Sequence, residues 1–227
     1  LPLLQGYGQT ETAPVISANP PEKIKLDTVG KVLKGNEVKI SEDGEILARG
    51  ELIMNGYWND PESTNKTIID GWVHTGDIGE FDEEDYLKIT DRKKDIIVNA
   101  GGDNISPSRI EAKLDIEPEI AQSMLYGDFK NYLVAILVPN ADLALEWAKD
   151  NNVEGDLNEI IKDSSFNKKM KDVVDKVNKS LSAIEQVRKF ILVDHEFTIE
   201  NNMMTPSMKV RRFAVKDKYG DQLENLY

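Results

Sequence analysis

The segment DRKKDIIVNAGGDNISPSRIE, residues 91–111, lies where the pattern of the sequence changes. Before it, residues 29–53 and 71–90 alternate apolar and polar side chains between turn signals, which is typical of antiparallel strands. Within it, a charged run ends the alternation, and DIIV predicts a short strand followed by a glycine loop. We therefore predict a domain boundary after Asp91.

Beyond the boundary, helical and strand patterns are mixed. Ser106-Pro107 predicts a helix start, because Ser can cap a helix and Pro suits its first position. The continuous apolar run YLVAILVP, residues 132–139, predicts a buried strand. A helical stripe predicts a core-facing helix and consists of Met170, Val173, Val174, Val177 and Leu181. After the segment that contains Lys209, the chain is predicted to end in a polar tail. The predicted fold class is α+β, with a small β-rich subdomain, residues 1–91, and a compact α+β domain, residues 92–227.

Composition excludes several functional classes. The 227 residues carry a net charge of −13, which disfavours general nucleic-acid binding through phosphate neutralisation. The sequence contains no cysteine, so disulfides, thiolate metal sites and cysteine nucleophiles are excluded. No apolar stretch approaches the roughly 20 residues that a membrane-spanning helix needs.

Two short motifs contain residue types that could bind a nucleotide. In GYGQTE, residues 6–11, Gly8 allows close backbone approach to a ligand, Thr10 can donate to a phosphate oxygen, and Glu11 can hold Mg²⁺. In HTGD, residues 74–77, Asp77 can accept hydrogen bonds from a pair of sugar hydroxyls. Taken alone, each motif is better explained as an ordinary turn.

Two further motifs admit similar alternatives. The Gly101-Gly102 loop is consistent with a linker and a helix-entry turn, and the G-x-G-x-x-G, P-loop and G-x-S-x-G patterns are absent. The segment MTPSMKVRRF, residues 204–213, sets Lys209 in an otherwise acidic protein. Lys209 either belongs to a solvated basic face or is directed at a phosphate.

The order of these motifs is more informative than any one of them. GYGQTE, GYWNDPEST, GWVHTGDIG, DRKKDIIVNAGGDNISP and TPSMKVRR together resemble the acyl-adenylate-forming enzymes in sequence and spacing. The resemblance extends from Gly6 to Arg212 and is nearest to the long-chain fatty-acid–CoA ligases. Amino-acid adenylation domains more often have glycine directly before the lysine, where this sequence has Met208.

The resemblance implies a two-step reaction and a nucleotide-binding set. ATP would activate a fatty acid to an acyl-adenylate, and the acyl group would pass to coenzyme A. Tyr7 would pack on the adenine, with Gly8 also in the nucleotide-binding set. Thr10 would contact the α-phosphate and Glu11 would bind Mg²⁺. Lys209 would reach the acyl carboxylate and the α-phosphate, which gives a catalytic set of Lys209, Thr10 and Glu11.

The same resemblance assigns roles around the boundary. Asp77 would bind both ribose hydroxyls, and Arg92 would add a second ribose contact. Lys94 would be the hinge about which a mobile C-terminal domain rotates between half-reactions. Gly101 and Gly102 would line the pantetheine passage.

The phosphate loop and the acyl pocket of such ligases lie upstream of the adenine motif. We therefore expect this chain to be the C-terminal part of a ligase, opening at the end of the large adenylate-forming domain, and to be inactive alone. We also expect its first residues to lack strand partners. The expected partners are small molecules (fatty acid, ATP and coenzyme A) and no nucleic acid. The expected location is cytoplasmic or peripheral to a membrane. Two alternatives are an adenylating ligase for another carboxylic acid and a non-catalytic nucleotide-binding module.

Overall fold

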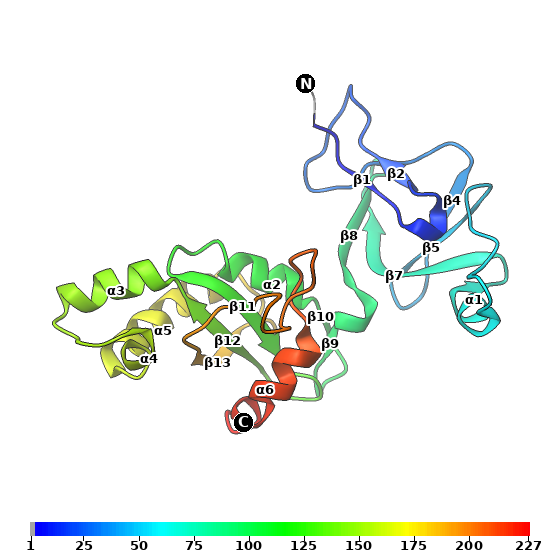
Figure 1. The fold of residues 1–227 in the computed structure, drawn as a ribbon. Coiled ribbons are helices and arrows are strands. Elements are labelled where there is room, and N and C mark those ends of the chain that lie inside the picture. The colour runs from blue at the N-terminus through cyan, green and yellow to red at the C-terminus, as the bar shows by residue number, and fades with distance from the viewer. Residues whose placement is uncertain (1–2) are drawn as a thin grey trace. The chain divides into compact units, whose positions relative to one another are not determined.

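The computed structural model describes residues 3–227 and divides into two compact units, Leu1–Asp95 and Ile96–Tyr227. Both units combine strands and helices, so the α+β class is confirmed (Figure 1). The boundary predicted after Asp91 falls just before this division.

The first unit is built mainly from short strands and one short helix. Its elements are β1 (Gly6–Tyr7), η1 (Thr10–Thr12), β2 (Ser17–Ala18), β3 (Lys31–Val32), β4 (Asn36–Ile40), β5 (Glu45–Gly50), α1 (Pro61–Thr67), β6 (Ile68–Ile69), β7 (Trp72–Phe81), β8 (Leu87–Arg92) and η2 (Lys93–Asp95).

Strand β7 organises this unit because it pairs antiparallel with three others, β5, β6 and β8. Its side chains alternate between buried and half-buried positions along most of its length, as expected for a central strand. The strands β1, β2 and β3 form a separate small sheet. The expectation that the first residues lack a strand partner is wrong for Gly6 and Tyr7, which pair with Ala18 and Ser17, whereas Leu1 and Pro2 lie outside the described residues.

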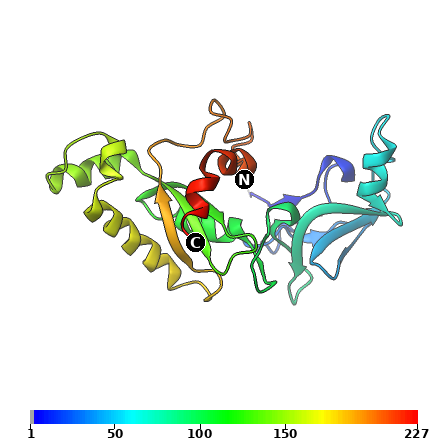
Figure 2. The same ribbon diagram turned by 90° about the horizontal axis from the view of Figure 1, so that it is seen from below.

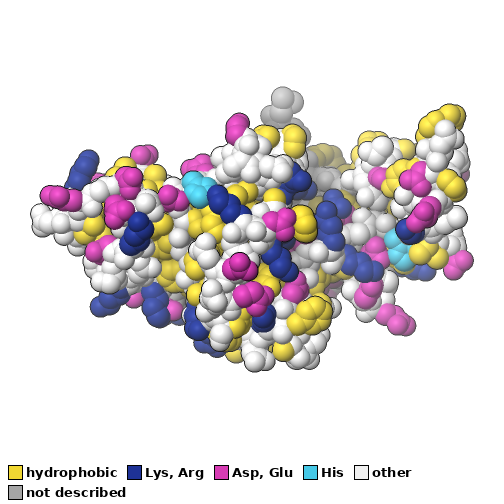
Figure 3. Space-filling model, turned by 60° about the horizontal axis from the view of Figure 1, so that its bottom comes forward, with side chains coloured by type: hydrophobic (Ala, Val, Ile, Leu, Met, Phe, Trp, Pro, Cys, Tyr) yellow, Lys and Arg dark blue, Asp and Glu magenta, His cyan; other side chains and the backbone are white. Residues whose placement is uncertain are grey.

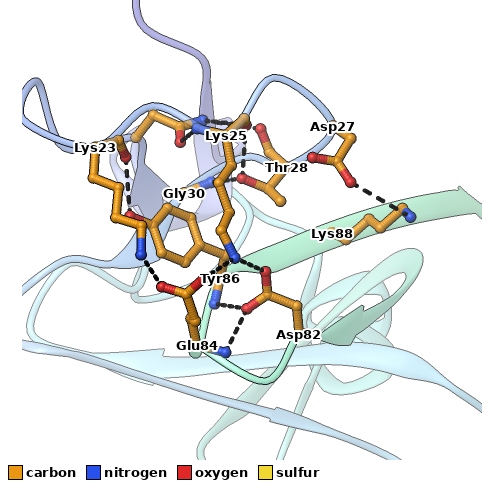
Figure 4. Close-up of polar contacts among 10 residues, drawn as sticks. Lys23, Lys25, Asp27, Thr28, Gly30, Asp82, Glu84, Tyr86 and Lys88 are labelled. Atoms are coloured by element: carbon orange, nitrogen blue, oxygen red, sulfur yellow. Dashed lines mark hydrogen bonds and ion pairs between the residues drawn. The ribbon is translucent and has the colours of Figure 1, made fainter.

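A lysine clasp attaches the loop before β3 to the turn between β7 and β8 (Figure 4). Lys25 Nζ lies 2.6 Å from Asp82 Oδ2 and 2.8 Å from Glu84 Oε1. The same ammonium lies 4.7 Å from the ring centroid of Tyr86, whose hydroxyl donates to the Lys23 carbonyl. The acidic turn between β7 and β8 is therefore bound by a cation of the same unit.

The second unit contains two hairpin strands, a three-stranded sheet and five helices. Its elements are β9 (Ile97–Val98), β10 (Asn104–Ile105), α2 (Pro107–Leu114), β11 (Ile120–Tyr126), β12 (Leu133–Pro139), α3 (Ala141–Asp150), α4 (Leu157–Ile160), α5 (Ser164–Asn178), β13 (Val187–Leu192) and α6 (Arg212–Glu224).

The middle strand β12 has buried side chains on both faces. Leu133 and Leu137 face the core that contains the α5 stripe, whereas Val134 and Ile136 face a second core that contains α6 residues. Strand β13 accordingly lies between α5 and α6 in Figure 2. Helices covering both faces explain why YLVAILVP is continuously apolar instead of alternating.

The C-terminal segment is a helix that contributes to the core. The sequence reading ended in a polar tail, but α6 buries Val215, Tyr219 and Leu223. The tail prediction is wrong because these three residues are spaced four apart, which places them on one face of a helix whose remaining residues are mostly polar. Strand β11 was also not predicted.

The surface mixes charges of both signs. Acidic and basic side chains intermingle over the face shown in Figure 3. Within residues 3–227, no helix is both long and apolar enough to span a bilayer.

We expect Leu223→Ala to lower the free energy of unfolding of the second unit by about 2–5 kcal/mol, because it leaves a cavity in a fully buried site. The measurement is native-state hydrogen exchange of the β12 amides. Gln222→Ala, an exposed neighbour on the same helix, is the control and should change that free energy by less than about 0.5 kcal/mol. Equal effects of the two substitutions would mean that α6 is a surface segment.

Candidate nucleotide-binding site

Asp77 lies in an interruption of the pairing between β5 and β7. Glu45 is opposite Ile78 and Leu47 is opposite His74, so a two-residue step on β5 faces a four-residue step on β7. The extra residues form a bulge at which Gly76 has φ +71°, a value that favours glycine. The bulge places Asp77 opposite Arg92 of β8.

The Asp77 carboxylate is buried and bound by two donors from different strands. The Tyr7 hydroxyl donates to Oδ2 at 2.6 Å, and Arg92 Nε lies 2.7 Å from Oδ1. Burial and the hydrogen bond to Asp77 raise the pKa of Tyr7 well above its usual range, so Tyr7 remains a donor at neutral pH. Since a carboxylate has about four acceptor positions, Asp77 retains capacity for ligand hydroxyls.

The loop after β1 is held by its own backbone. A Cβ on Gly8 would lie 1.9 Å from the Pro14 carbonyl oxygen, so any other residue would displace the chain there. Gln9 N donates to the Thr12 hydroxyl at 3.0 Å, which closes the turn containing Thr10 and Glu11. Close packing within the loop therefore accounts for Gly8, and its predicted ligand contact stays a prediction.

Glu11 is oriented by a tyrosine that the sequence analysis did not identify. The Tyr57 hydroxyl donates to Glu11 Oε1 at 2.7 Å, and Met54 N donates to the Glu11 carbonyl at 2.9 Å. The hydrogen bond to Glu11 raises the pKa of Tyr57. Among residues 3–227, no group of three or more His, Asp or Glu side chains could hold a metal ion. A single carboxylate still fits Mg²⁺, which is commonly held by one or two carboxylates together with substrate phosphates.

The residues that follow Arg92 are anchored to the same unit. Lys93 Nζ lies 2.7 Å from Asp43 Oδ2 and 2.9 Å from Glu45 Oε2. This ammonium, followed by the Ser41 hydroxyl, lowers the pKa of Asp43 to about 2. Lys94, the predicted hinge, is exposed in η2. The residue of this segment that is held by ion pairs is therefore Lys93, directly before it.

In the second unit, Gly101 and Gly102 lie in the turn between β9 and β10. Asn99 Oδ1 accepts from the amides of Gly101 at 2.8 Å and Asp103 at 2.9 Å. Gly102 has φ +86°, whereas a Cβ there would meet nothing within 4 Å, so backbone conformation is the requirement at this position. Asn99 thus fixes an exposed glycine turn.

Lys209 lies on another exposed turn of the second unit. Thr205 N donates to the Lys209 carbonyl at 2.8 Å, and Lys209 N donates to the Thr205 hydroxyl at 3.1 Å. Between them Met208 has φ +60°, the left-handed conformation in which glycine is favoured. Within the described part of the chain, the Lys209 ammonium forms no ion pair, so its charge is available to a ligand.

The structure brings only some of the predicted residues together. Tyr7, Asp77 and Arg92 are in direct contact, and Glu11 lies one short turn beyond Tyr7. Gly101, Gly102 and Lys209 belong to the second unit. Three positioning residues were missed, namely Glu45, Tyr57 and Asn99. Of these, Glu45 gave a signal, since it is a carboxylate at the start of a strand whose next three residues are apolar.

Two parts of the chain match models of one enzyme family. Residues 1–58 match the family described as AMP-binding enzyme, and residues 94–227 match the AMP-binding enzyme C-terminal domain. The chain belongs to the AMP-binding enzyme family. The predicted resemblance to the adenylate-forming superfamily is therefore confirmed.

Similar proteins agree with this assignment. The chain is 34% identical over 229 residues to the long-chain-fatty-acid–CoA ligase FadD15 of Mycobacterium bovis, covering 100% of this chain and 38% of that protein. The chain thus spans about two fifths of the length of the curated relatives it matches.

Two solved structures share the fold. The adenylation domain of a carboxylate reductase from Mycobacterium chelonae matches with a TM-score of 0.78 and 26% identity, over 99% of this chain and 34% of that one. The O-succinylbenzoate coenzyme A synthetase of Bacillus subtilis, in complex with ATP and magnesium, matches with a TM-score of 0.68 and 27% identity, over 95% of this chain and 42% of that one.

We expect Asp77→Asn in the full-length protein to weaken AMP binding by about 10- to 100-fold, the loss typical of hydrogen bonds to a charged acceptor. The measurement is the dissociation constant of AMP by calorimetry, with thermal unfolding recorded in parallel because Arg92 loses its partner. Glu80→Gln, an exposed carboxylate on the same strand, should leave the affinity unchanged. Unchanged AMP affinity in a folded Asp77→Asn protein would exclude Asp77 as a ribose ligand.

Proposed function

We propose that the full-length protein is an ATP- and Mg²⁺-dependent long-chain fatty-acid–CoA ligase. This chain would supply its ribose-binding carboxylate, its magnesium ligand and its adenylation lysine. The observation that carries the proposal is the Tyr7–Asp77–Arg92 cluster, in a chain similar to such ligases over its entire length.

The cluster suits a ribose because its geometry is fixed before a ligand binds. Arg92 and Tyr7 each hold one oxygen of Asp77, so the carboxylate loses little rotational freedom when two hydroxyls donate to it. The Tyr7 ring, which this hydrogen bond also fixes, would pack on the adenine. Thr10 would donate to the α-phosphate, and Glu11, held by Tyr57, would bind Mg²⁺, which neutralises phosphate charge.

In the first half-reaction a carboxylate oxygen of the fatty acid attacks the α-phosphorus of ATP. The bond to the β-phosphate oxygen breaks, and an acyl-adenylate and pyrophosphate are formed. Negative charge accumulates on phosphoryl and carboxylate oxygens in the transition state. We assign its stabilisation to Lys209, because its ammonium is unpaired within the described residues and is presented by a closed turn.

In the second half-reaction the thiol of coenzyme A attacks the acyl carbon and AMP leaves. The turn at Gly101 and Gly102 would line the passage for the pantetheine arm, and Lys94 would be the hinge between the two half-reactions. The Asn99 bonds keep that turn narrow and its glycine backbone exposed, which suits close approach of a thin chain.

A different carboxylic acid is the second candidate substrate. A carboxylate reductase domain and an O-succinylbenzoate synthetase share the fold, and their names indicate other acids. Small-molecule partners and a location in the cytoplasm, or peripheral to a membrane, complete the proposal.

The deciding experiment is ATP–pyrophosphate exchange by the full-length protein across carboxylates of different length and shape. Exchange that peaks with long-chain fatty acids supports the proposal. A peak with aryl or short acids would assign a different ligase. Absence of exchange with every acid, in a protein that binds AMP, would identify a nucleotide-binding module.

We expect Lys209→Ala in the full-length protein to slow adenylation by about 10²–10³, or about 3–4 kcal/mol, comparable to loss of an oxyanion donor. Conversion of supplied acyl-adenylate to thioester should be nearly unchanged, because the lysine acts in the first half-reaction. The two steps are measured separately on one preparation.

Lys168→Ala is the matched control for the lysine, since Lys168 is likewise exposed and lies on a helix of the same unit. It should leave both steps unchanged. Equal losses in the two steps for Lys209→Ala, or none, would refute its assignment as the adenylation lysine.

A further inference from the structure

Glu45 is a buried carboxylate for which the proposed reaction has no role. Its side chain is 4% exposed, yet it accepts from three groups that are distant in sequence. Oε2 lies 2.9 Å from both His74 Nδ1 and Lys93 Nζ, and Oε1 accepts from Gly76 N at 2.9 Å. Burial opposes the charged form, but the bonds to Lys93, His74 and Gly76 hold the pKa of Glu45 below its usual range.

One oxygen of Glu45 completes the bulge that presents Asp77. A bulge leaves backbone groups without ladder partners, and Gly76 N is such a group. Glu45 Oε1 accepts from it, while the Thr75 hydroxyl accepts from Asp77 N at 3.1 Å and donates to the Ile46 carbonyl at 2.7 Å. Side chains thus replace the missing backbone pairing, and the position of Asp77 depends on them.

The other oxygen of Glu45 binds the segment that follows Arg92. Arg92 and Lys93 are adjacent, and each is bound by a carboxylate that flanks the bulge, Asp77 for Arg92 and Glu45 for Lys93. The bulge carrying Asp77 and the adjacent residues Arg92 and Lys93 are therefore joined by two contacts. Displacement of either end requires breaking a contact to a carboxylate that is almost inaccessible to water.

We propose that Glu45 is a positioning residue that couples nucleotide binding at Asp77 to the conformation of residues 92–95. When a ligand binds Asp77, opening of the already ordered bulge becomes less favourable, and Glu45 in turn holds Lys93 more firmly next to the predicted hinge Lys94. When Lys93 is released, the bulge loses a constraint, and Asp77 binds its ligand less well. This inference rests on the proposed function, because it takes Asp77 as the ribose ligand.

The chain contains a matched control for an ordinary ion pair. Lys25, like Lys93, is bound by two carboxylates of the first unit, at 2.6 and 2.8 Å for Lys25 and at 2.7 and 2.9 Å for Lys93 (Figure 4). The carboxylates that bind Lys25, Asp82 and Glu84, lie in the turn after β7, and among the described residues their side chains bind Lys23, Lys25 and backbone amides of that same turn. Substitution of Lys25 thus measures how much stability the first unit loses with a comparable pair of lysine–carboxylate contacts, while the contacts of Asp77 are kept.

The experiment measures AMP binding and hydrogen exchange in the full-length protein. We expect Lys93→Met and Glu45→Gln each to weaken AMP binding by about 3- to 10-fold, although neither side chain belongs to the proposed nucleotide contacts. In the unsubstituted protein AMP should slow amide exchange in residues 92–96, and both substitutions should abolish that protection. The variant that carries both Lys93→Met and Glu45→Gln should bind AMP no more weakly than whichever single variant has the lower affinity. The reason is that both substitutions remove the same contact, the one between Glu45 and Lys93.

The controls separate coupling from loss of stability. Lys25→Met should lower the melting temperature and leave both AMP affinity and AMP-dependent protection of residues 92–96 unchanged. Lys93→Arg, which keeps the charge, should restore most of the affinity lost in Lys93→Met. Reduced melting temperature with unchanged AMP affinity in Lys93→Met would show a merely structural ion pair and overturn the inference.

Failure of the proposed function would appear differently. If Asp77→Asn binds AMP as tightly as the unsubstituted protein, Asp77 is not the ribose ligand and both proposals fall. If Asp77→Asn weakens binding whereas Lys93→Met and Glu45→Gln do not, only the coupling is refuted.

Discussion

The interruption of the β5–β7 pairing at Gly76 is the constraint on which the candidate site depends. In a regular ladder, Asp77 would be paired with a residue of β5, which the interruption prevents. The bulge instead sets Asp77 opposite Arg92 and within 2.6 Å of the Tyr7 hydroxyl. A bulge is stable only if its unpaired backbone groups are satisfied, and Glu45 and Thr75 do this with side-chain oxygens. The binding geometry thus follows from a local departure from regular pairing.

Sequence patterns predicted those parts of the fold that depend on burial along one element. The apolar run of β12 and the α5 stripe were identified correctly. A strand buried on both faces gives a continuous apolar run, and a helix buried on one face gives apolar residues at helical spacing, so both can be read from the sequence. Helix α6 was missed because its three buried residues are separated by polar residues and a glycine, so its apolar face is narrow. Its stability comes from packing on the second core, which involves residues distant in the sequence.

The sequence predicted which residues belong to the candidate site, from their types and from the order of the motifs, but it did not predict how these residues contact one another. Asp77 and Arg92 could be chosen from the resemblance, but their contact depends on a strand register that no local pattern specifies. The Tyr57–Glu11 hydrogen bond joins residues 46 positions apart, and the Glu45–Lys93 bond joins residues 48 apart. Such pairs arise from tertiary structure, so the linear sequence does not show which residue each one contacts, even where a single member such as Glu45 stands out. Positioning residues are therefore harder to predict than the residues they position.

The turn before Lys209 shows how the same backbone constraint can be met by different residues. Met208 occupies a left-handed conformation, which costs a non-glycine residue roughly 1–2 kcal/mol. Glycine at this position, as in many amino-acid adenylation domains, removes that cost but leaves the unfolded turn more flexible. The hydrogen bonds between Thr205 and Lys209 close the turn in spite of the strain at Met208. Pro206 restricts the backbone conformation of the turn because its ring fixes φ. The requirement at position 208 is therefore a backbone conformation that directs Lys209 outward, and the identity of the side chain is secondary to it.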